Sequence, residues 1–315
     1  MEYNGKAHIG EFAKYFNLTQ LTGDEGALKR WAVVPDINRP GLELAGYFEH
    51  SEPKRIMIMG TKELAFMNTI QPTVLAERLE RITDEYCPAI VISKNQTCPP
   101  VLIEIAHRKN FPVFSSVLPT YRLMVDVITY LDQQLAPTDN IHGVLLSIYG
   151  KGVLITGDSG MGKSETALEL IRRGHVLVAD DRVDVSRIHN ILFGKAPELL
   201  TGMLEIRGIG VIDVNKMFGS SSTLARNEVD FIIHLEKWDD QKEYARVGIE
   251  ADIFENILEL NIPKVVIPVR EGRNIAVLVE SAVSNFNLKL LGFNSAKEFE
   301  QRVYDFIKKQ KEENS

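Results

Sequence analysis

One stretch of the chain has the composition and spacing of a phosphate-binding loop. It reads Gly-Asp-Ser-Gly-Met-Gly-Lys-Ser and matches the pattern G-x-x-x-x-G-K-[ST]. Its glycines let successive backbone N–H groups converge on phosphate oxygens, and the N-terminus of the following helix adds partial positive charge. In such a loop the lysine reaches the β- and γ-phosphates and the last hydroxyl binds Mg²⁺. The candidate nucleotide-binding residues are therefore Gly157, Asp158, Ser159, Gly160, Met161, Gly162, Lys163 and Ser164.

The residues around this loop predict the strand and the helix that it requires. The apolar run Val153–Thr156 predicts a strand entering the loop, and residues 165–173 have the spacing of a helix that stops at Gly174. A chance glycine-rich turn would not be expected to have both. The pattern in its context therefore predicts binding of a nucleotide.

Acidic residues that follow apolar runs are candidates for metal and proton chemistry. Asp180 and Asp181 end the run that begins at His175, in the layout of a Walker B strand. A competing run ends in Glu236. We favour the aspartate pair because two adjacent acids can divide the work, one near Mg²⁺ and one accepting a proton from an attacking hydroxyl. The alternative for the pair is a solvated turn with Arg182 as its partner.

Three further groups of residues are candidates for the same site. The run 204–213 has two glycines spaced by one residue, and it fits a strand with a bulge as well as a loop of the site. Arg246, Arg270 and Arg273 lie near glycines, where arginines suit bidentate phosphate binding, although each alone also fits an exposed turn. His142 follows a polar segment, and a lone histidine is more often structural than catalytic.

The rest of the chain predicts the elements that must position these residues. In the first 130 residues, strands are predicted at 55–59, 89–93 and 112–115, and helices at 71–86, 101–109 and 122–134. This alternation favours an α/β layer with a parallel sheet. Further on, strands are predicted at 143–147, 152–156, 176–179, 231–235 and 265–269, with a hairpin turn at 149–152, and helices at 253–260 and 296–310.

Length and composition limit the class of protein. The chain has 315 residues, of which 44% are hydrophobic and 25% charged, as in a globular protein. That length predicts two domains, and the Pro-containing polar segment 136–140 marks the boundary between 1–134 and 135–315. With two cysteines, no visible signal peptide and no long apolar run, a cytoplasmic protein without disulfides or a membrane span is expected. A net charge of −7 without a basic stripe argues against nucleic-acid binding.

Taken together, these residues resemble the HPr kinase/phosphorylase family, bacterial enzymes that act on a serine of the phosphocarrier protein HPr. The run 204–214 and the aspartate pair close behind the phosphate loop carry the most specific part of the resemblance. Segments 92–96 and 114–116 extend it into the first half of the chain. The resemblance implies an α/β protein with an N-terminal regulatory or assembly domain. Its second domain would be a phosphate-loop kinase domain similar to the phosphoenolpyruvate carboxykinase core.

The resemblance also implies a role for each candidate residue. The catalytic residues would be His142, Lys163, Asp181 and Arg246, and the Mg²⁺ ligands Ser164 and Glu205, with Asp180 as a further candidate. Both reactions would use Leu204, Glu205, Ile206, Arg207, Gly208, Ile209, Gly210 and Asp213. The loop for dephosphorylation would be Ile267, Pro268, Val269, Arg270, Glu271, Gly272 and Arg273, with Glu271 where the family has proline.

The implied function is a bifunctional enzyme of carbon catabolite repression. It would phosphorylate HPr with ATP or pyrophosphate and remove the phosphoryl group with inorganic phosphate, giving pyrophosphate. HPr, its paralogue Crh and further copies of the chain in a homohexamer are the implied partners, and a glycolytic intermediate the implied regulator. Two alternatives stay open: a small-molecule kinase on the same core, and a nucleotide-dependent regulatory switch.

Overall fold

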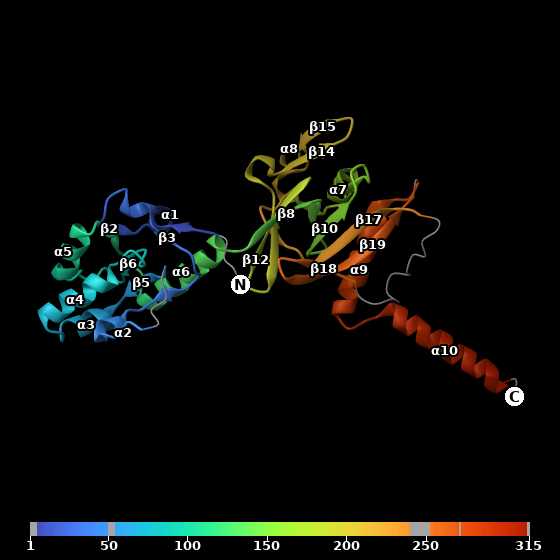
Figure 1. The fold of residues 1–315 in the computed structure, drawn as a ribbon. Helices are drawn as coiled ribbons and strands as arrows, with labels where there is room; N and C mark the ends of the chain where they lie inside the picture. The colour runs from blue at the N-terminus through green and yellow to red at the C-terminus, as the bar shows by residue number, and fades with distance from the viewer. Residues whose placement is uncertain (1–4, 50–53, 240–252, 271, 314–315) are drawn as a thin grey trace. The chain divides into compact units, whose positions relative to one another are not determined.

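The computed structural model describes residues 5–49, 54–239, 253–270 and 272–313. It divides into two compact units, Met1–Pro137 and Thr138–Ser315, which are taken in turn (Figure 1). In the described parts of the chain, no helix combines the length and the apolar character needed to cross a bilayer.

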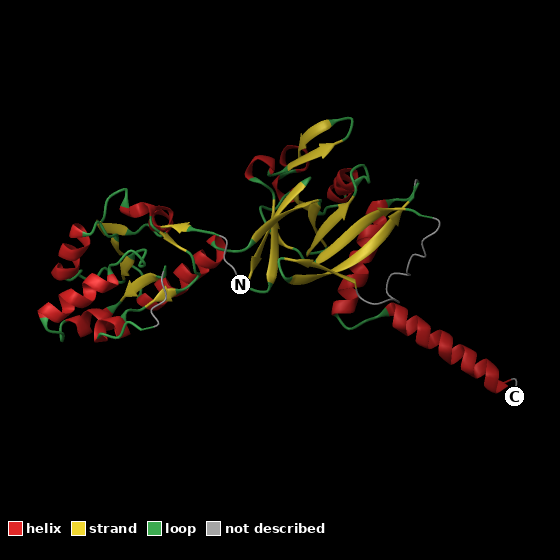
Figure 2. Cartoon of the chain, viewed as in Figure 1, coloured by secondary structure: helices red, strands yellow, loops and turns green. Residues whose placement is uncertain are grey.

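The N-terminal unit is built on a five-stranded sheet in the order β2-β7-β6-β5-β4, with helices on both faces (Figure 2). Its strands are β2 (Thr19–Thr22), β4 (Ile37–Asn38), β5 (Ile56–Met59), β6 (Ile90–Ile92) and β7 (Val113–Ser115), and β1 (Ala7–His8) pairs separately with β3 (Trp31–Ala32). The helices are α1 (Ile9–Tyr15), α2 (Gly41–Ala45), α3 (Thr61–Met67), α4 (Pro72–Ile82), α5 (Pro100–Arg108) and α6 (Thr120–Gln134), with a 3₁₀ turn at Ala27–Lys29. The three strands and three helices predicted for this half are confirmed, with α4 shorter than expected.

Strand alternation distributes the core of this unit over both faces of the sheet. Along β5, Ile56 and Ile58 pack with α1 and α6, whereas Met57 and Met59 pack with α3, α4 and α5. Strands β4 to β7 pair in parallel, so both faces must be covered and the strands are apolar on both sides.

The C-terminal unit contains a six-stranded sheet in the order β11-β9-β10-β17-β19-β18 and a four-stranded sheet in the order β16-β13-β12-β8. The larger sheet is formed by β9 (Val144–Ile148), β10 (Lys151–Gly157), β11 (Val176–Ala179), β17 (Phe231–Lys237), β18 (Ile253–Ile257) and β19 (Leu260–Val269). The smaller sheet is formed by β8 (Thr138–His142), β12 (Arg182–Ile188), β13 (Ile191–Lys195) and β16 (Asn227–Glu228), and a separate hairpin by β14 (Met203–Ile206) and β15 (Gly210–Asp213). The helices are α7 (Lys163–Arg172), α8 (Val214–Phe218), α9 (Ile275–Leu290) and α10 (Ser295–Glu313), with 3₁₀ turns at Glu198–Leu200 and Ser220–Ser222.

The two faces of the larger sheet have different coverings. Val153 and Ile155 of β10 pack on one face with residues of α7 and α9, while Leu154 packs on the other face with residues of the smaller sheet. The C-terminal unit is therefore a three-layer arrangement of helices, sheet and sheet, and the phosphate loop lies at the end of a central strand that is buried from residue 152 to 156.

Strand direction brings the sequence-distant candidates to one edge of the larger sheet. β10, β17 and β19 are mutually parallel, and β11 runs the same way because both β11 and β10 are antiparallel to β9. The carboxyl ends of these strands therefore share one edge, which is where open α/β sheets bind ligands. His142 lies at the same edge because it stands two residues before the start of β9, which runs in the opposite direction.

Several sequence predictions for the C-terminal half need correction. The helix predicted at 253–260 is wrong: these residues form β18, a turn and the start of β19. Its turn residues, Leu258 and Glu259, both have positive φ without the Asn-Gly signal usual at such turns. Helix α9 was not predicted. The run 204–213 is a hairpin, not a single bulged strand.

Candidate active site

The phosphate loop connects β10 to α7 with a backbone that requires glycine. Gly157, Gly160 and Gly162 have φ values of 142°, 83° and 78°, in the region that side chains disfavour. A Cβ at Gly157 would lie 2.4 Å from the carbonyl oxygen of Leu235 on the neighbouring strand β17. The predicted strand and helix around the loop are confirmed by β10 and α7. The sequence pattern therefore corresponds to a real strand–loop–helix unit at the sheet edge.

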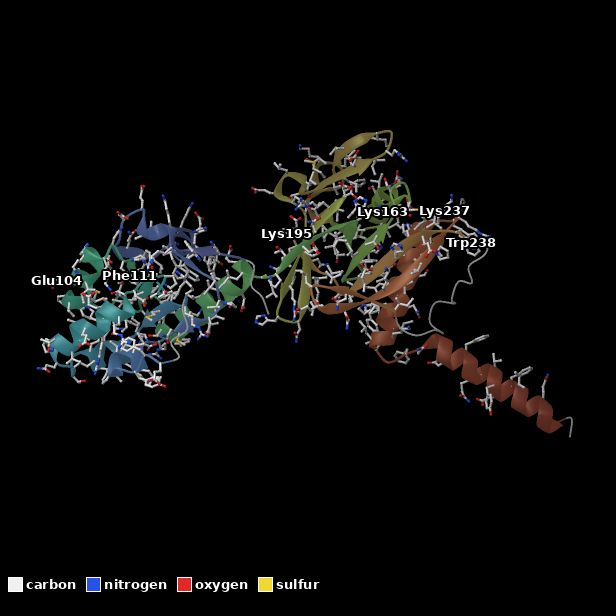
Figure 3. The ribbon with its side chains drawn as sticks, viewed as in Figure 1. Glu104, Phe111, Lys163, Lys195, Lys237 and Trp238 are labelled. Atoms are coloured by element: carbon white, nitrogen blue, oxygen red, sulfur yellow. The ribbon has the colours of Figure 1, made fainter. Side chains whose placement is uncertain are left out.

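Lys163, labelled in Figure 3, binds the backbone of this loop. Its side chain is only 7% exposed, and its Nζ donates to the carbonyl oxygens of Gly157, at 2.8 Å, and of Asp158, at 3.0 Å. A buried ammonium needs such acceptors, and phosphate oxygens are better ones. The loop is thus shaped to exchange its own carbonyls for an anionic ligand.

Asp180 joins the phosphate loop to the hairpin. Its Oδ1 accepts a hydrogen bond from Ser164 Oγ at 3.0 Å, and its Oδ2 accepts one from the backbone N–H of Glu205 at 3.0 Å. Burial raises the pKa of the Asp180 carboxyl, and these two hydrogen bonds partly oppose that shift. Asp180 therefore links three segments of the predicted site.

Asp181 has a strained backbone and an accessible side chain. Its φ is +65°, a conformation that an aspartate adopts only when its surroundings impose it. His142 provides part of those surroundings: its Nδ1 lies 2.9 Å from the Asp181 carbonyl oxygen and 3.2 Å from Oδ1. The N–H of Gly143 donates to the same carbonyl at 3.1 Å. Both side chains remain more than half exposed, at 63% for Asp181 and 56% for His142, so an external hydroxyl could reach them.

In the hairpin β14–β15, one face of the run 204–213 is buried and the other is exposed. Leu204 and Ile206 are buried in the core beneath it, whereas Glu205 is exposed on the opposite face, across from Val211. Tight turning at Gly208 and Gly210 is allowed by their φ values of 84° and 99°. Arg207 reaches over the phosphate loop, since its Nη1 would lie 3.6 Å from a Cβ built on Gly160.

Ile209 and Asp213 of the predicted run 204–213 differ from Glu205 and Arg207 in where their side chains lie. Ile209 lies at the hairpin tip and is exposed. Asp213 caps helix α8, because its Oδ1 accepts a hydrogen bond from the backbone N–H of Lys216 at 3.0 Å. The side chain of Asp213 thus already has a structural function.

The arginine-containing loop follows β19 at the same edge. Ile267 is buried, Pro268 and Val269 complete the strand, and Arg270, Gly272 and Arg273 follow as exposed residues. The backbone N–H of Arg273 donates to the carbonyl oxygen of Arg270 at 3.3 Å. Two predicted residues, Arg246 and Glu271, lie outside the described residues.

Sequence reasoning missed one residue of β17 and one that follows it, both close to the site. His234 is paired in register with Thr156, the residue before the phosphate loop, and its Nδ1 lies 3.0 Å from Thr156 Oγ1. Trp238 follows the end of β17 and contacts Arg270. A polar residue within the apolar run 231–235 was the available signal for His234, whereas Trp238 had none.

The available oxygen donors suit Mg²⁺ better than a softer metal. The hydroxyl of Ser164 and the carboxylate of Asp180 are in direct contact, and Glu205 follows in the hairpin. Across the described residues, no group of three or more His, Cys, Asp and Glu side chains is placed to hold a metal by itself. Mg²⁺ commonly binds proteins through one or two carboxylates together with the phosphates of a nucleotide.

A phosphate loop, an oxygen donor set and an accessible carboxylate at one sheet edge define a phosphotransferase of the phosphate-loop class. Residues 8–131 match the family described as HPr Serine kinase N terminus, and residues 133–303 match the HPr Serine kinase C-terminal domain. The chain belongs to this HPr serine kinase family.

Two relatives align with nearly the whole chain, and a solved structure aligns with about half of it. It is 43% identical over 303 residues to the HPr kinase/phosphorylase of Geobacillus thermodenitrificans, covering 96% of this chain and 97% of the relative. It is 41% identical, with the same coverage, to the HPr kinase/phosphorylase of Bacillus subtilis. The solved HPr(Ser) kinase/phosphatase of Coxiella burnetii is 39% identical and covers 51% of this chain and 98% of its own, with a TM-score of 0.45.

Proposed function

We propose that the chain phosphorylates a serine of HPr with ATP and removes the phosphoryl group by phosphorolysis. The observation that carries this proposal is the pairing of an exposed, strained Asp181 with His142 at the edge that holds the phosphate loop. Family membership supports the choice of HPr as substrate. Action on Crh and assembly as a cytoplasmic homohexamer are part of the same proposal.

In the forward reaction, Asp181 accepts the proton of the serine hydroxyl as its oxygen attacks the γ-phosphorus. The bond from the γ-phosphorus to the bridging oxygen breaks and ADP leaves. Lys163 exchanges its loop carbonyls for β- and γ-phosphate oxygens. Arg207 lies over the loop, where it can balance charge on the transferred group, and we assign Arg246 the same task.

In the reverse reaction, an oxygen of inorganic phosphate attacks the phosphorus of phosphoserine. The bond to the serine oxygen breaks, that oxygen takes a proton from Asp181, and pyrophosphate forms. The phosphate loop holds the attacking phosphate where the β-phosphate of ATP lies in the forward direction. His142 orients Asp181 in both directions, consistent with its contacts to the carboxylate and the carbonyl.

When bound, Mg²⁺ supplies a Lewis acid that polarises the transferred phosphoryl group. We assign its protein ligands to Ser164 and Glu205, with Asp180 as a further ligand or as the acceptor that orients Ser164. The hairpin residues 204–210 and 213 serve both reactions, and the loop 267–273 serves dephosphorylation. We assign catalysis to residues 135–315 and regulation or assembly to residues 1–134.

The decisive experiment uses the full chain with purified HPr. ATP should yield phosphoserine-HPr, and inorganic phosphate added to that product should yield pyrophosphate. Release of orthophosphate without pyrophosphate would contradict phosphorolysis. Transfer to a small molecule in place of HPr would favour a small-molecule kinase, and nucleotide binding without any transfer would favour a regulatory switch.

A further inference from the structure

Trp238 connects the ends of two strands at the active-site edge. Register pairs Lys237 of β17 with Val269 of β19, so Trp238 and Arg270 are the next residues on neighbouring parallel strands. The backbone N–H of Trp238 donates to the carbonyl oxygen of Val269 at 3.1 Å. β17 lies between β10, which carries the phosphate loop, and β19, which leads into the arginine loop (Figure 3). Trp238 thus follows the strand that separates the two loops.

The indole ring contacts the arginines of that loop. The guanidinium carbon of Arg270 lies 3.6 Å from the ring centroid, and that of Arg273 lies 5.7 Å away. A cation above an aromatic face is attracted by the ring quadrupole. Stacking restricts the rotamers of a long side chain, and a planar guanidinium presents its N–H donors around its edge, where phosphate oxygens bind. The ring therefore fixes where Arg270 presents these donors.

We propose that Trp238 is a positioning residue for phosphorolysis, whose ring fixes Arg270 at the edge where inorganic phosphate must bind. This inference rests on the proposed function. Inorganic phosphate lacks the adenosine part that anchors ATP, so its binding depends more strongly on prearranged cations. The ring therefore affects the KM for inorganic phosphate more than the KM for ATP.

The test compares Trp238→Leu with Trp238→Phe in the full chain. Rates of pyrophosphate formation from phosphoserine-HPr are measured against inorganic phosphate concentration, and rates of HPr phosphorylation against ATP concentration. Trp238→Leu should raise the KM for phosphate about two- to tenfold, the range that a cation–π contact of ordinary strength supplies. Trp238→Phe, which keeps an aromatic face, should recover most of that change.

A matched control is available in the N-terminal unit. Trp31 also lies under cations, with the Nζ atoms of Lys6 and Lys54 at 4.3 and 5.1 Å from its ring centroid. Trp31→Leu makes the same chemical change and should leave the KM for phosphate unaltered. Trp238→Met gives a second route should Trp238→Leu fail to fold, because methionine also lacks an aromatic face. Trp238→Met should raise the same KM in the wild type and change it little when Arg270 is already replaced by Gln.

The possible results separate the inference from the proposed function. An unchanged KM for phosphate in folded Trp238→Leu overturns the inference alone, as does an equal loss in both reaction directions or an equal loss in the Phe variant. A wild-type chain that forms no pyrophosphate overturns the proposed function and the inference with it.

Discussion

Each unit places the carboxyl ends of parallel strands at one edge of a sheet, but the polar groups at the two edges are used differently. In the N-terminal unit, the hydroxyls of Ser93 and Thr120 lie 2.7 Å apart, and Ser115 Oγ donates to Asn95 Oδ1 at 3.0 Å. The backbone N–H groups of Lys94 and Asn95 donate to carbonyls that follow β7. These groups hydrogen-bond to one another and so stabilise the segments that follow β6 and β7.

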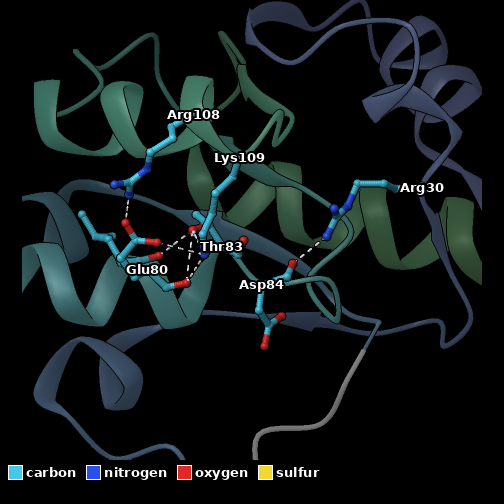
Figure 4. A network of polar contacts seen from close by, with 7 residues as sticks. Arg30, Glu80, Thr83, Asp84, Arg108 and Lys109 are labelled. Carbon is cyan, nitrogen blue, oxygen red and sulfur yellow. Dashed lines mark hydrogen bonds and ion pairs between the residues drawn. The ribbon is translucent and has the colours of Figure 1, made fainter.

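At the C-terminal ends of helices α4 and α5 in the N-terminal unit, polar groups also bind one another (Figure 4). Lys109 donates to the carbonyl oxygens of Glu80 and Thr83 at the end of α4, and Arg108 pairs with the Glu80 carboxylate. Arg30 donates to the carbonyl of Asp84 at 2.6 Å. Cations at a helix C-terminus satisfy its last carbonyls and its dipole, so this network stabilises the fold.

At the edge of the C-terminal unit Ser164 also binds Asp180, but Lys163 and the exposed carboxylate of Asp181 keep contacts that a substrate can replace. Lys163 has backbone carbonyls as its acceptors, and Asp181 is anchored through its backbone while its carboxylate stays exposed. Chemistry requires groups that are oriented yet can exchange a partner for substrate. The comparison separates a stabilising edge in the N-terminal unit from the edge of the C-terminal unit that we propose as the reactive edge.

Removing the exposed acid should have the largest effect on the reactive edge. We expect Asp181→Asn to lower the rates of HPr phosphorylation and of phosphorolysis by about 10²- to 10⁴-fold, the usual range for a general acid–base group. ATP binding, measured by calorimetry, should persist because the phosphate loop is intact. Loss in only one direction would contradict a shared acid–base role.

The lysine of the phosphate loop should come next. We expect Lys163→Met to lower the phosphorylation rate by about 10²- to 10³-fold, since a preorganised charge at the transferred group is lost. The methionine fills a similar volume at this buried position, so circular dichroism should match that of the wild type. Near-normal transfer by a folded variant would remove Lys163 from the reactive edge.

A change at the stabilising edge should affect folding and leave catalysis unaltered. We expect Ser93→Ala to lower the free energy of unfolding of the N-terminal unit by about 1 kcal/mol, because the buried Ser93 hydroxyl loses its hydrogen bond to Thr120. Urea unfolding measures this change, and the HPr phosphorylation rate is the control. A lower rate without lower stability would mean that this edge also takes part in the reaction.

The cysteines of the N-terminal unit should be the least sensitive sites. Burial raises the pKa of both Cys87 and Cys98 to about 12, so both thiols stay neutral at pH 8 and gain reactivity only as the pH approaches that value. We expect iodoacetamide to modify folded protein at pH 8 about 10³-fold more slowly than unfolded protein. Mass spectrometry follows the modification, and rapid alkylation of the folded chain would disprove the shielding.

Local patterns were predictive where local residues dictate the backbone. The phosphate loop, its strand and its helix follow from glycines and apolar spacing within a short segment. Residues 253–260, wrongly predicted as a helix, have apolar side chains whose spacing fits both a helix and a strand. Pairing of 253–257 with residues 260–264 makes this segment a strand. Helix α9 was not recognised because its first turns are apolar on all sides and so lack an amphipathic pattern. Such a composition is typical of a helix that covers a sheet.

The sequence by itself determined the chemical class, because a phosphate loop depends on contiguous glycines, one lysine and one hydroxyl. It also supplied every acid and arginine of the candidate site. Only the tertiary structure decided which of them meet. His142 reaches Asp181 because β8 pairs with β12 and sets Arg182 opposite His142, and Trp238 meets Arg270 because β17 and β19 end together. Such contacts depend on strand register between distant segments. That register is fixed by the burial of both faces of the sheet, so no local sequence pattern predicts it.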